Sequence, residues 1–326
     1  MNAELNRRLR AWIGAAGKAP LVAIVAPSGY PPDNEAMQRA IVNLCDQGCR
    51  VRNYYESDRR FQRFAATEAG RLAQVHAAAR DPEVDVVLAL RGGYGLTRLL
   101  PALDFSMLAA SGKLFVGHSD FTVLQMGLLA HGAASFAGPM LCDDFLRDEL
   151  SAYTLEHFWQ CVLQPEHLVE AEARGNPAVE LEGMLWGGNL AMLTHLVGTP
   201  YLPAIDNGIL FVEDVNEHPY RVERMLLQLS HAGILARQRA LLLGDFSAYR
   251  LSEYDNGYDF AQMLAWLRAH LTIPVLTGLP FGHGRDKVTL VNGAKAQLQS
   301  DGNGFRLRMH GYPFLGQAGR SSRIPA

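Results

Sequence analysis

The first half of the sequence predicts an α/β fold in which a parallel sheet is covered by helices on both faces. Apolar runs suited to buried strands alternate with helical patterns along this half of the chain. The strand candidates are residues 21–29, 49–55, 85–93 and 113–117, and the helix candidates between them are residues 34–48 and 64–80. Continuous apolar strands separated by helices are typical of parallel sheets that are buried on both sides.

The second half of the sequence predicts more β-structure. The alternation weakens after about residue 150, and the short strand candidates that follow are residues 178–188, 208–215, 239–247 and 274–282. Helical patterns cover residues 151–164, 220–233 and 258–271. Near the C-terminus, Asn292-Gly293 and Asp301-Gly302 lie between alternating runs, which predicts β-hairpins.

Length and composition indicate two globular domains. A chain of 326 residues is long for one ordinary core and sufficient for two. Hydrophobic residues make up 48% and charged residues 19%, which is typical of globular proteins. We therefore expect an N-terminal domain at 1–150, a helix and polar linker at 151–178, and a C-terminal domain at 179–326.

Charge and hydropathy exclude several classes of partner. The formal net charge of −3 provides no basic field for nucleic acid or an anionic membrane. A membrane-spanning helix needs about 18 consecutive apolar residues, and no run in this sequence is nearly that long. Residues 1–20 lack the sustained apolar core of a signal peptide. We expect a cytoplasmic protein with neither a nucleic-acid nor a membrane partner.

The cysteine and histidine patterns predict neither disulfides nor a metal site. There is no C-x-x-C pair, which suits reduced thiols better than a disulfide framework. There is no H-E-x-x-H motif, and the eleven histidines are scattered. We expect no metal and no cofactor.

Ser119 lies in a tight turn between the apolar run at 113–117 and an amphipathic helix. It either caps that helix or acts as a nucleophile, with neighbouring amides at the helix N-terminus available to an oxyanion. The G-x-S-x-G elbow of α/β-hydrolases is not matched, because Phe121 occupies the second glycine position. His118 is a poor base for Ser119, since adjacent side chains leaving a strand point to opposite sides.

A glycine pair, Gly92 and Gly93, follows the buried strand candidate that ends near residue 90. Glycines allow close backbone approach and leave amides accessible. The loop could therefore line an oxyanion hole beside Ser119, cradle a phosphate or form a plain turn. The dinucleotide and P-loop fingerprints are both absent, which weakens the nucleotide interpretation.

Two further polar residues follow apolar strand candidates in the second half. Glu213 ends the run GILFVE, and His283 stands between two glycines in FGHG. Each residue alone is more often structural. Together with Ser119 they supply a nucleophile, a base and an orienting acid, all on the strand-end turns where ligands bind to parallel sheets.

At these residues the chain resembles the LD-carboxypeptidase family of serine peptidases over essentially its full length. The matching pieces are VAPSG (25–29), RGGYG (91–95), GHSDFT (117–122), GGNL (187–190), FVEDVNEHPYRVERML (211–226) and FGHG (281–284). The resemblance implies a Rossmann- or flavodoxin-like N-terminal domain and a smaller β-rich C-terminal domain, with the active site between them. It also implies a homodimer.

Carried over to this chain, the resemblance makes Ser119 the nucleophile, His283 the base and Glu213 its orienting partner, with the amides of Gly93 and Asp120 as the oxyanion hole. Family members remove the terminal D-alanine from murein tetrapeptides during cell-wall recycling. The expected substrate contacts are Arg91, for the terminal carboxylate, with Gly92 and Trp186.

Three alternatives remain open at this stage. The family also contains immunity-type peptidases that cleave peptidyl-nucleotide toxins, but these carry a longer insertion between nucleophile and glutamate, whereas the interval here is compact. The glycine loop could instead belong to a non-hydrolytic module that binds nucleotides or sugar phosphates. A non-catalytic scaffold is the third alternative.

Overall fold

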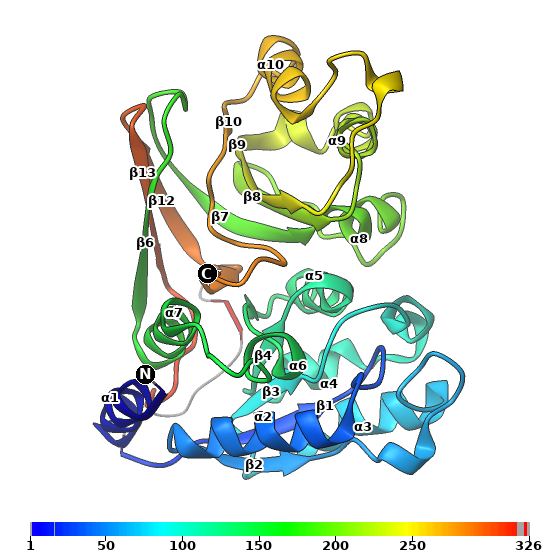
Figure 1. The fold of residues 1–326 in the computed structure, drawn as a ribbon, viewed down its shortest axis with the longest axis vertical. Coiled ribbons are helices and arrows are strands. Elements are labelled where there is room, and N and C mark those ends of the chain that lie inside the picture. Colours follow the sequence, from blue (N-terminus) through cyan, green and yellow to red (C-terminus); the bar gives the residue numbers. More distant parts are fainter. Residues whose placement is uncertain (1, 16, 318–322, 325–326) are drawn as a thin grey trace.

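The computed structural model describes residues 2–15, 17–317 and 323–324. It contains two sheets, each flanked by helices (Figure 1). The first sheet, in the lower part of Figure 1, has the order β11-β5-β4-β3-β1-β2. Its strands are β1 Leu21–Val25, β2 Arg50–Asn53, β3 Val86–Ala89, β4 Leu114–Gly117, β5 Ser135–Ala137 and β11 Leu290–Asn292.

Strands β1 to β5 are parallel and run in the order 2-1-3-4-5, which is the flavodoxin-like arrangement. The predicted α/β class with a parallel sheet is therefore confirmed. The helices of this part are α1 Asn2–Ala15, α2 Asn34–Asp46, α3 Glu68–Arg80, α4 Phe105–Ala110, α5 Thr122–Ala130, α6 Leu141–Asp144 and α7 Ala152–Leu163.

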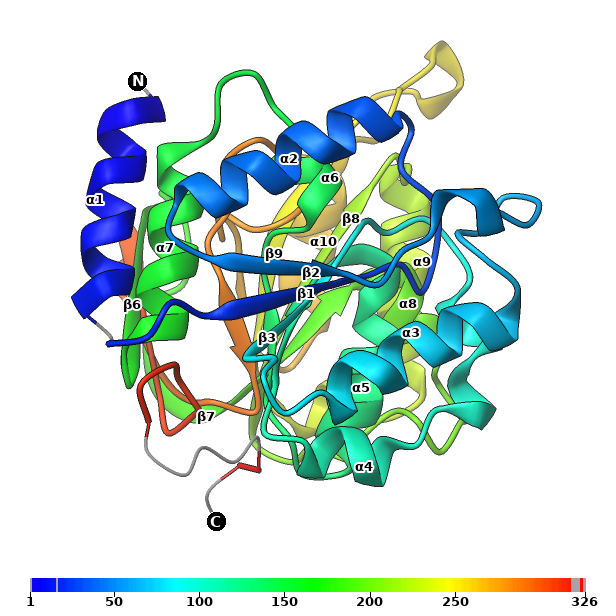
Figure 2. The same ribbon diagram turned by 90° about the horizontal axis from the view of Figure 1, so that it is seen from below.

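Helices cover both faces of the first sheet because its strands are apolar on both sides. Along β1, Val22 and Ile24 pack in one core cluster with α2, while Ala23 and Val25 pack in a second cluster with α3, α4 and α5. Figure 2 shows α2 and α7 on one side of β1 and β2, and α3, α4 and α5 on the other. Capping side chains set the helix starts: Asp33 accepts from the amide of Glu35 at the start of α2.

The second sheet has the order β10-β9-β8-β7-β12-β13-β6. Its strands are β6 Glu166–Glu172, β7 Val179–Asn189, β8 Gly208–Val215, β9 Gln238–Ser247, β10 Val275–Leu276, β12 Lys295–Ser300 and β13 Gly304–His310. Strands β7 to β10 are parallel and the others antiparallel. The accompanying helices are α8 Leu190–His195, α9 Pro219–His231 and α10 Phe260–His270.

Short 3₁₀ turns complete the description, at Ser57–Arg59, Leu96–Arg98, Leu100–Ala102, Ser119–Phe121, Leu235–Arg237 and Glu253–Asp255. Within the described ranges, no helix has both the length and the apolar character needed to cross a membrane.

The structure corrects two sequence-based details. Residues 166–172, expected to be linker, form β6, the edge strand that pairs with β13. The turn at Asp301-Gly302 does join the hairpin β12–β13, as predicted. The turn at Asn292-Gly293 makes no hairpin, because β11 pairs with β5 of the first sheet while β12 pairs with β7 of the second.

The two sheets share their hydrophobic core. One cluster joins Val116 of β4 to Phe211 of β8, and the other joins Phe115 of β4 to Leu210 of β8. The carboxyl end of β4, where Ser119 follows, therefore faces the second sheet across a continuous apolar interior.

Candidate active site

Ser119 sits in a strained turn at the carboxyl end of β4. It opens the 3₁₀ turn Ser119–Phe121 with a φ of 59°, in the left-handed region that non-glycine residues seldom adopt. Helix α5 begins three residues later with Phe121 at its N-cap and no side-chain capping bond. The capping interpretation of Ser119 is therefore wrong, and its side chain is partly exposed.

The glycine loop presses against this serine. A Cβ atom built at Gly92 would lie 2.8 Å from Cβ and 2.9 Å from Oγ of Ser119, closer than real Cβ contacts come. Gly93 follows with a φ of 108° and is exposed. A side chain at position 92 would thus displace the Ser119 hydroxyl, which explains why this loop needs a glycine there.

Asp120 ties three segments together through its carboxylate. Its Oδ2 accepts from Ser28 Oγ at 2.6 Å and from the Leu96 amide at 3.0 Å. Burial raises the pKa of Asp120, although these bonds and nearby cations lower it. The sequence indicated a role only for the Asp120 amide, whereas its side chain fastens the VAPSG segment and the residue that follows RGGYG to the serine turn.

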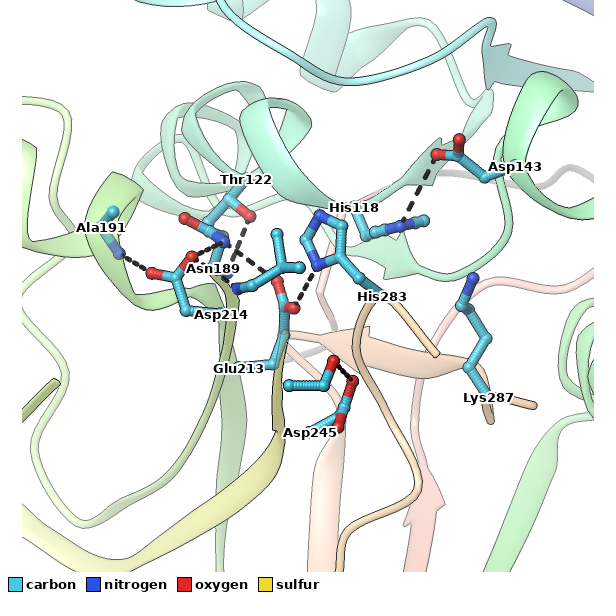
Figure 3. A network of polar contacts seen from close by, with 12 residues as sticks. His118, Thr122, Asp143, Asn189, Ala191, Glu213, Asp214, Asp245, His283 and Lys287 are labelled. Atoms are coloured by element: carbon cyan, nitrogen blue, oxygen red, sulfur yellow. Dashed lines mark hydrogen bonds and ion pairs between the residues drawn. The ribbon is translucent and has the colours of Figure 1, made fainter. Parts of the chain in front are cut away.

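Glu213 and His283 form a close hydrogen bond. The Glu213 side chain lies near the carboxyl end of β8 and is completely buried, and its Oε2 lies 2.7 Å from Nδ1 of His283 (Figure 3). Burial lowers the pKa of His283, but the hydrogen bond and charge of Glu213 outweigh it and raise the pKa above the usual value. With Nδ1 engaged, Nε2 is the ring nitrogen that can exchange a proton with a substrate.

His283 reaches Glu213 because a glycine precedes it. Gly282 has a φ of 151°, and a Cβ there would lie 2.7 Å from Cβ of Asp245 and 3.3 Å from Oε2 of Glu213. The His283 ring lies 5.2 Å from the ring of His118, the residue that precedes Ser119. The structure therefore brings Glu213 and His283 together between the two sheets and places the His283 ring beside the residue that precedes Ser119.

His118 is a buried neutral neighbour of this group. Its Nδ1 lies 2.9 Å from the Gly138 carbonyl oxygen, and since a carbonyl oxygen only accepts, Nδ1 is the protonated nitrogen that donates this hydrogen bond. Burial, and then the positive charges of Lys287 and His283, hold the pKa of His118 well below its usual value. His118 is thus engaged with the end of β5, in agreement with its exclusion as the base for Ser119.

Asn189, at the end of β7, holds the buried carboxylates. Its Nδ2 donates to Glu213 Oε1 at 3.2 Å and to Asp214 Oδ1 at 2.9 Å, and its backbone amide donates to Thr122 Oγ1 at 3.1 Å (Figure 3). Burial, followed by the charge of Glu213, raises the pKa of Asp214 to about 6. The GGNL motif contained this residue, but its role depends on contacts that the motif alone does not reveal.

The two remaining candidate contacts have other partners. Arg91 is partly exposed and its Nη1 donates to the Tyr30 carbonyl oxygen at 3.1 Å. Trp186 is 1% exposed and its Nε1 donates to Gln238 Oε1 at 2.8 Å within the core of the second sheet. Because it is buried there, Trp186 offers no surface to a substrate, and its expected contact is corrected.

The chain matches one protein family along both of its halves. The pattern of the LD-carboxypeptidase N-terminal domain covers residues 22–138, and that of the LD-carboxypeptidase C-terminal domain covers residues 182–298. The chain belongs to the LD-carboxypeptidase family. The matched segments contain Ser119, Glu213 and His283.

Members of the LD-carboxypeptidase family with known names or structures agree with this assignment. A crystal structure of muramoyltetrapeptide carboxypeptidase from Oxalobacter formigenes is 57% identical, with a TM-score of 0.87 over 90% of this chain and 99% of that chain. The murein tetrapeptide carboxypeptidase of Pseudomonas aeruginosa is 34% identical over 88% of this chain and 94% of its own. The microcin C7 self-immunity protein MccF of Escherichia coli is 26% identical over 68% of this chain and 73% of its own.

Proposed function

We propose that this protein is a serine LD-carboxypeptidase that releases D-alanine from murein tetrapeptides by cleaving the bond after the L-centre of the diamino acid. The observation that carries the proposal is the 2.7 Å bond between buried Glu213 and His283, formed beside the strained turn of Ser119. A histidine oriented by a buried carboxylate is the base that such a serine needs for acyl transfer. The names of the 57% and 34% identical relatives support the choice of substrate.

In this mechanism His283 Nε2 takes the proton of Ser119 as the hydroxyl attacks the peptide carbonyl. Glu213 orients the imidazole and stabilises the imidazolium that forms. The amides of Gly93 and Asp120 donate to the oxyanion in this proposal, as the family resemblance implies.

Collapse of the tetrahedral intermediate breaks the carbon–nitrogen bond. His283 passes its proton to the departing nitrogen, so that D-alanine leaves and an ester to Ser119 remains. A water molecule that gives a proton to His283 then hydrolyses this acyl-enzyme and releases the tripeptide. The protein is proposed to act in the cytoplasm as a homodimer, as the family resemblance implies.

The immunity-type activity is the less favoured candidate. An aromatic side chain that stacks on a nucleotide base must be accessible, whereas Trp186 is enclosed in the core. The relative with an immunity name is also less similar, at 26% identity, than the two murein carboxypeptidases.

The direct test is to incubate the protein with murein tetrapeptide and to measure D-alanine release. Wild type should release D-alanine, and Ser119→Ala should reduce kcat by a factor on the order of 10⁴ or more. Ser57→Ala, at an exposed serine of another 3₁₀ turn, is the matched control and should behave as wild type. An inactive wild type, or an equally active Ser119→Ala variant, would show that the proposal is wrong.

A further inference from the structure

A charged pocket of about 510 Å³ adjoins the catalytic histidine. His283 forms one wall together with His118, and the other walls come from the start of α2 and from the segment that follows β5. The side chains that give the pocket its chemistry are Arg39, Asp143, Arg147 and Asp148. The mechanism above assigns no role to any of these four residues.

The position of the pocket relative to His283 indicates which part of a substrate it would receive. In acyl transfer from a peptide, the base that deprotonates the nucleophile also protonates the leaving amine. The leaving amino acid must therefore lie against the histidine. A pocket that His283 itself lines is placed for the leaving group rather than for the acyl part of the substrate.

The pocket is close to the glycine loop as well. The amide of Cys142, a lining residue, donates to the Leu90 carbonyl oxygen at 2.9 Å, and Leu90 directly precedes the RGGYG segment. Gly92 of that segment is the residue that touches Ser119. The segment that lines the pocket is thus bonded to the residue directly before the glycine loop, and His283 lines the same pocket.

Two arginines give the pocket cationic groups suited to a carboxylate. Arg147 is half-buried and fixed by its Nε, which donates to the Asp143 carbonyl oxygen at 2.9 Å. That bond leaves its terminal nitrogens to bind a ligand. Arg39 is exposed on the first turns of α2 at the mouth of the same pocket. Guanidinium groups bind carboxylates through paired, charge-assisted hydrogen bonds.

The third cation of the pocket is already neutralised. Lys287 is 1% exposed, and its Nζ lies 2.5 Å from Oδ1 of Asp144, which is equally buried. Asp143 has a different position, since its partly exposed carboxylate lies 3.9 Å from Nε2 of His118 and faces the pocket (Figure 3). Two arginines and nearby carboxylates suit a zwitterion better than a simple anion, and a released amino acid is a zwitterion.

We propose that this pocket is the leaving-group subsite, in which Arg147 and Arg39 bind the free α-carboxylate of the C-terminal D-amino acid. The inference rests on the proposed function and deepens it, because a requirement for a free carboxylate makes the enzyme a carboxypeptidase rather than an endopeptidase. Arg91, the residue expected from the sequence, donates one hydrogen bond to the Tyr30 carbonyl and does not line this pocket. Asp143 faces the amine that forms when the carbon–nitrogen bond breaks and His283 supplies its proton.

The experiment compares murein tetrapeptide with the same peptide ending in D-alaninamide. Wild type should prefer the free acid. A charge-assisted hydrogen bond lost in Arg147→Gln should lower the ratio of kcat/KM for acid over amide by about 10- to 100-fold. Arg147→Lys should recover part of that loss, and Arg39→Gln should have a smaller effect because Arg39 is exposed. Arg306→Gln on β13, where the arginine pairs with Glu170, is the control.

Product inhibition gives a second measurement that depends on the same contacts. D-alanine should compete with substrate in wild type, and its inhibition constant should rise in Arg147→Gln and Arg39→Gln by factors that match the kinetic losses. Should Arg147→Gln fail to fold, Arg147→Lys and Arg39→Gln provide the same comparison. An active wild type whose acid-to-amide ratio is unchanged in these variants overturns this inference alone. A wild type that releases no D-alanine overturns the proposed function, and this inference with it.

Discussion

Replacing Gly92 by alanine adds one methyl group against the side chain of Ser119. The new Cβ would lie 2.8 Å from Cβ and 2.9 Å from Oγ of Ser119, and 3.5 Å from Cε of Met140. Carbon atoms in ordinary contact are about 3.5–4.0 Å apart, so roughly 1 Å of movement is needed. The new Cβ would be at an ordinary contact distance from Met140, so the side chain that has to move is that of Ser119.

Ser119 cannot absorb this movement without cost, because its backbone is already held at a φ of 59°. A displacement of about 1 Å in a reacting group can lower a rate about 100-fold. Overpacking typically destabilises a protein by about 1–3 kcal/mol. We therefore expect Gly92→Ala to fold, to melt at a somewhat lower temperature, and to lose about 100-fold or more in kcat.

The assay is D-alanine release from murein tetrapeptide, with a thermal melt of the same preparation. Gly14→Ala is the matched control, because a Cβ at Gly14 of α1 meets nothing within 4 Å. Alanine also favours a helix by about 1 kcal/mol over glycine. That variant should keep wild-type activity. A Gly92→Ala protein with wild-type kcat would refute the claim that close packing of Gly92 fixes a catalytically essential position of Ser119.

Three further perturbations test the surrounding groups. Because a base must be neutral to accept a proton, the raised pKa of His283 should place the acid limb of the kcat/KM profile above pH 6.5. Glu213→Gln should move that limb to lower pH and reduce kcat by a factor on the order of 10⁴, whereas an unmoved limb would contradict the assignment of His283 as the titrating base. Asn189→Ala should lower kcat about tenfold and cost about 1–3 kcal/mol in a urea titration, since two buried carboxylates each lose a donor. Lys287→Met should cost about 3–5 kcal/mol in the same titration by leaving buried Asp144 unpaired, and an unchanged midpoint would show that this pair adds no stability.

The sequence was most informative where local pattern and function coincide. Ser119, Glu213 and His283 each follow an apolar run, at the carboxyl ends of strands where parallel sheets bind their ligands, although two sheets contribute them. Polar residues at those points therefore predict a shared site, and the structure joins two of them, Glu213 and His283, by a hydrogen bond. The flavodoxin-like part was predictable for the same reason, because each strand and helix in it has its own apolar pattern.

The sequence was less informative where long-range pairing decides the structure. Strand β11 has three residues, and nothing in its pattern indicates that its partner is β5 rather than β12. The hydrogen bonds of Asp120 and Asn189 join segments up to 92 positions apart. Trp186 lies on β7, and its burial depends on which helices and strands pack against that strand. Such contacts are fixed by tertiary packing, which local pattern does not encode.

Strand β11 comes from the C-terminal half of the chain but pairs with β5 in the sheet of the N-terminal half. This pairing matters for experiments that divide the protein. A fragment ending near residue 150 would lack β11 and would expose the edge of β5 as an unpaired template for aggregation. A fragment starting near residue 179 would contain β11 with no strand to pair with. Co-expression of the two fragments should instead restore both the sheet and the activity, because the segment from His283 to β11 fastens the base of one half to the sheet that presents the serine of the other.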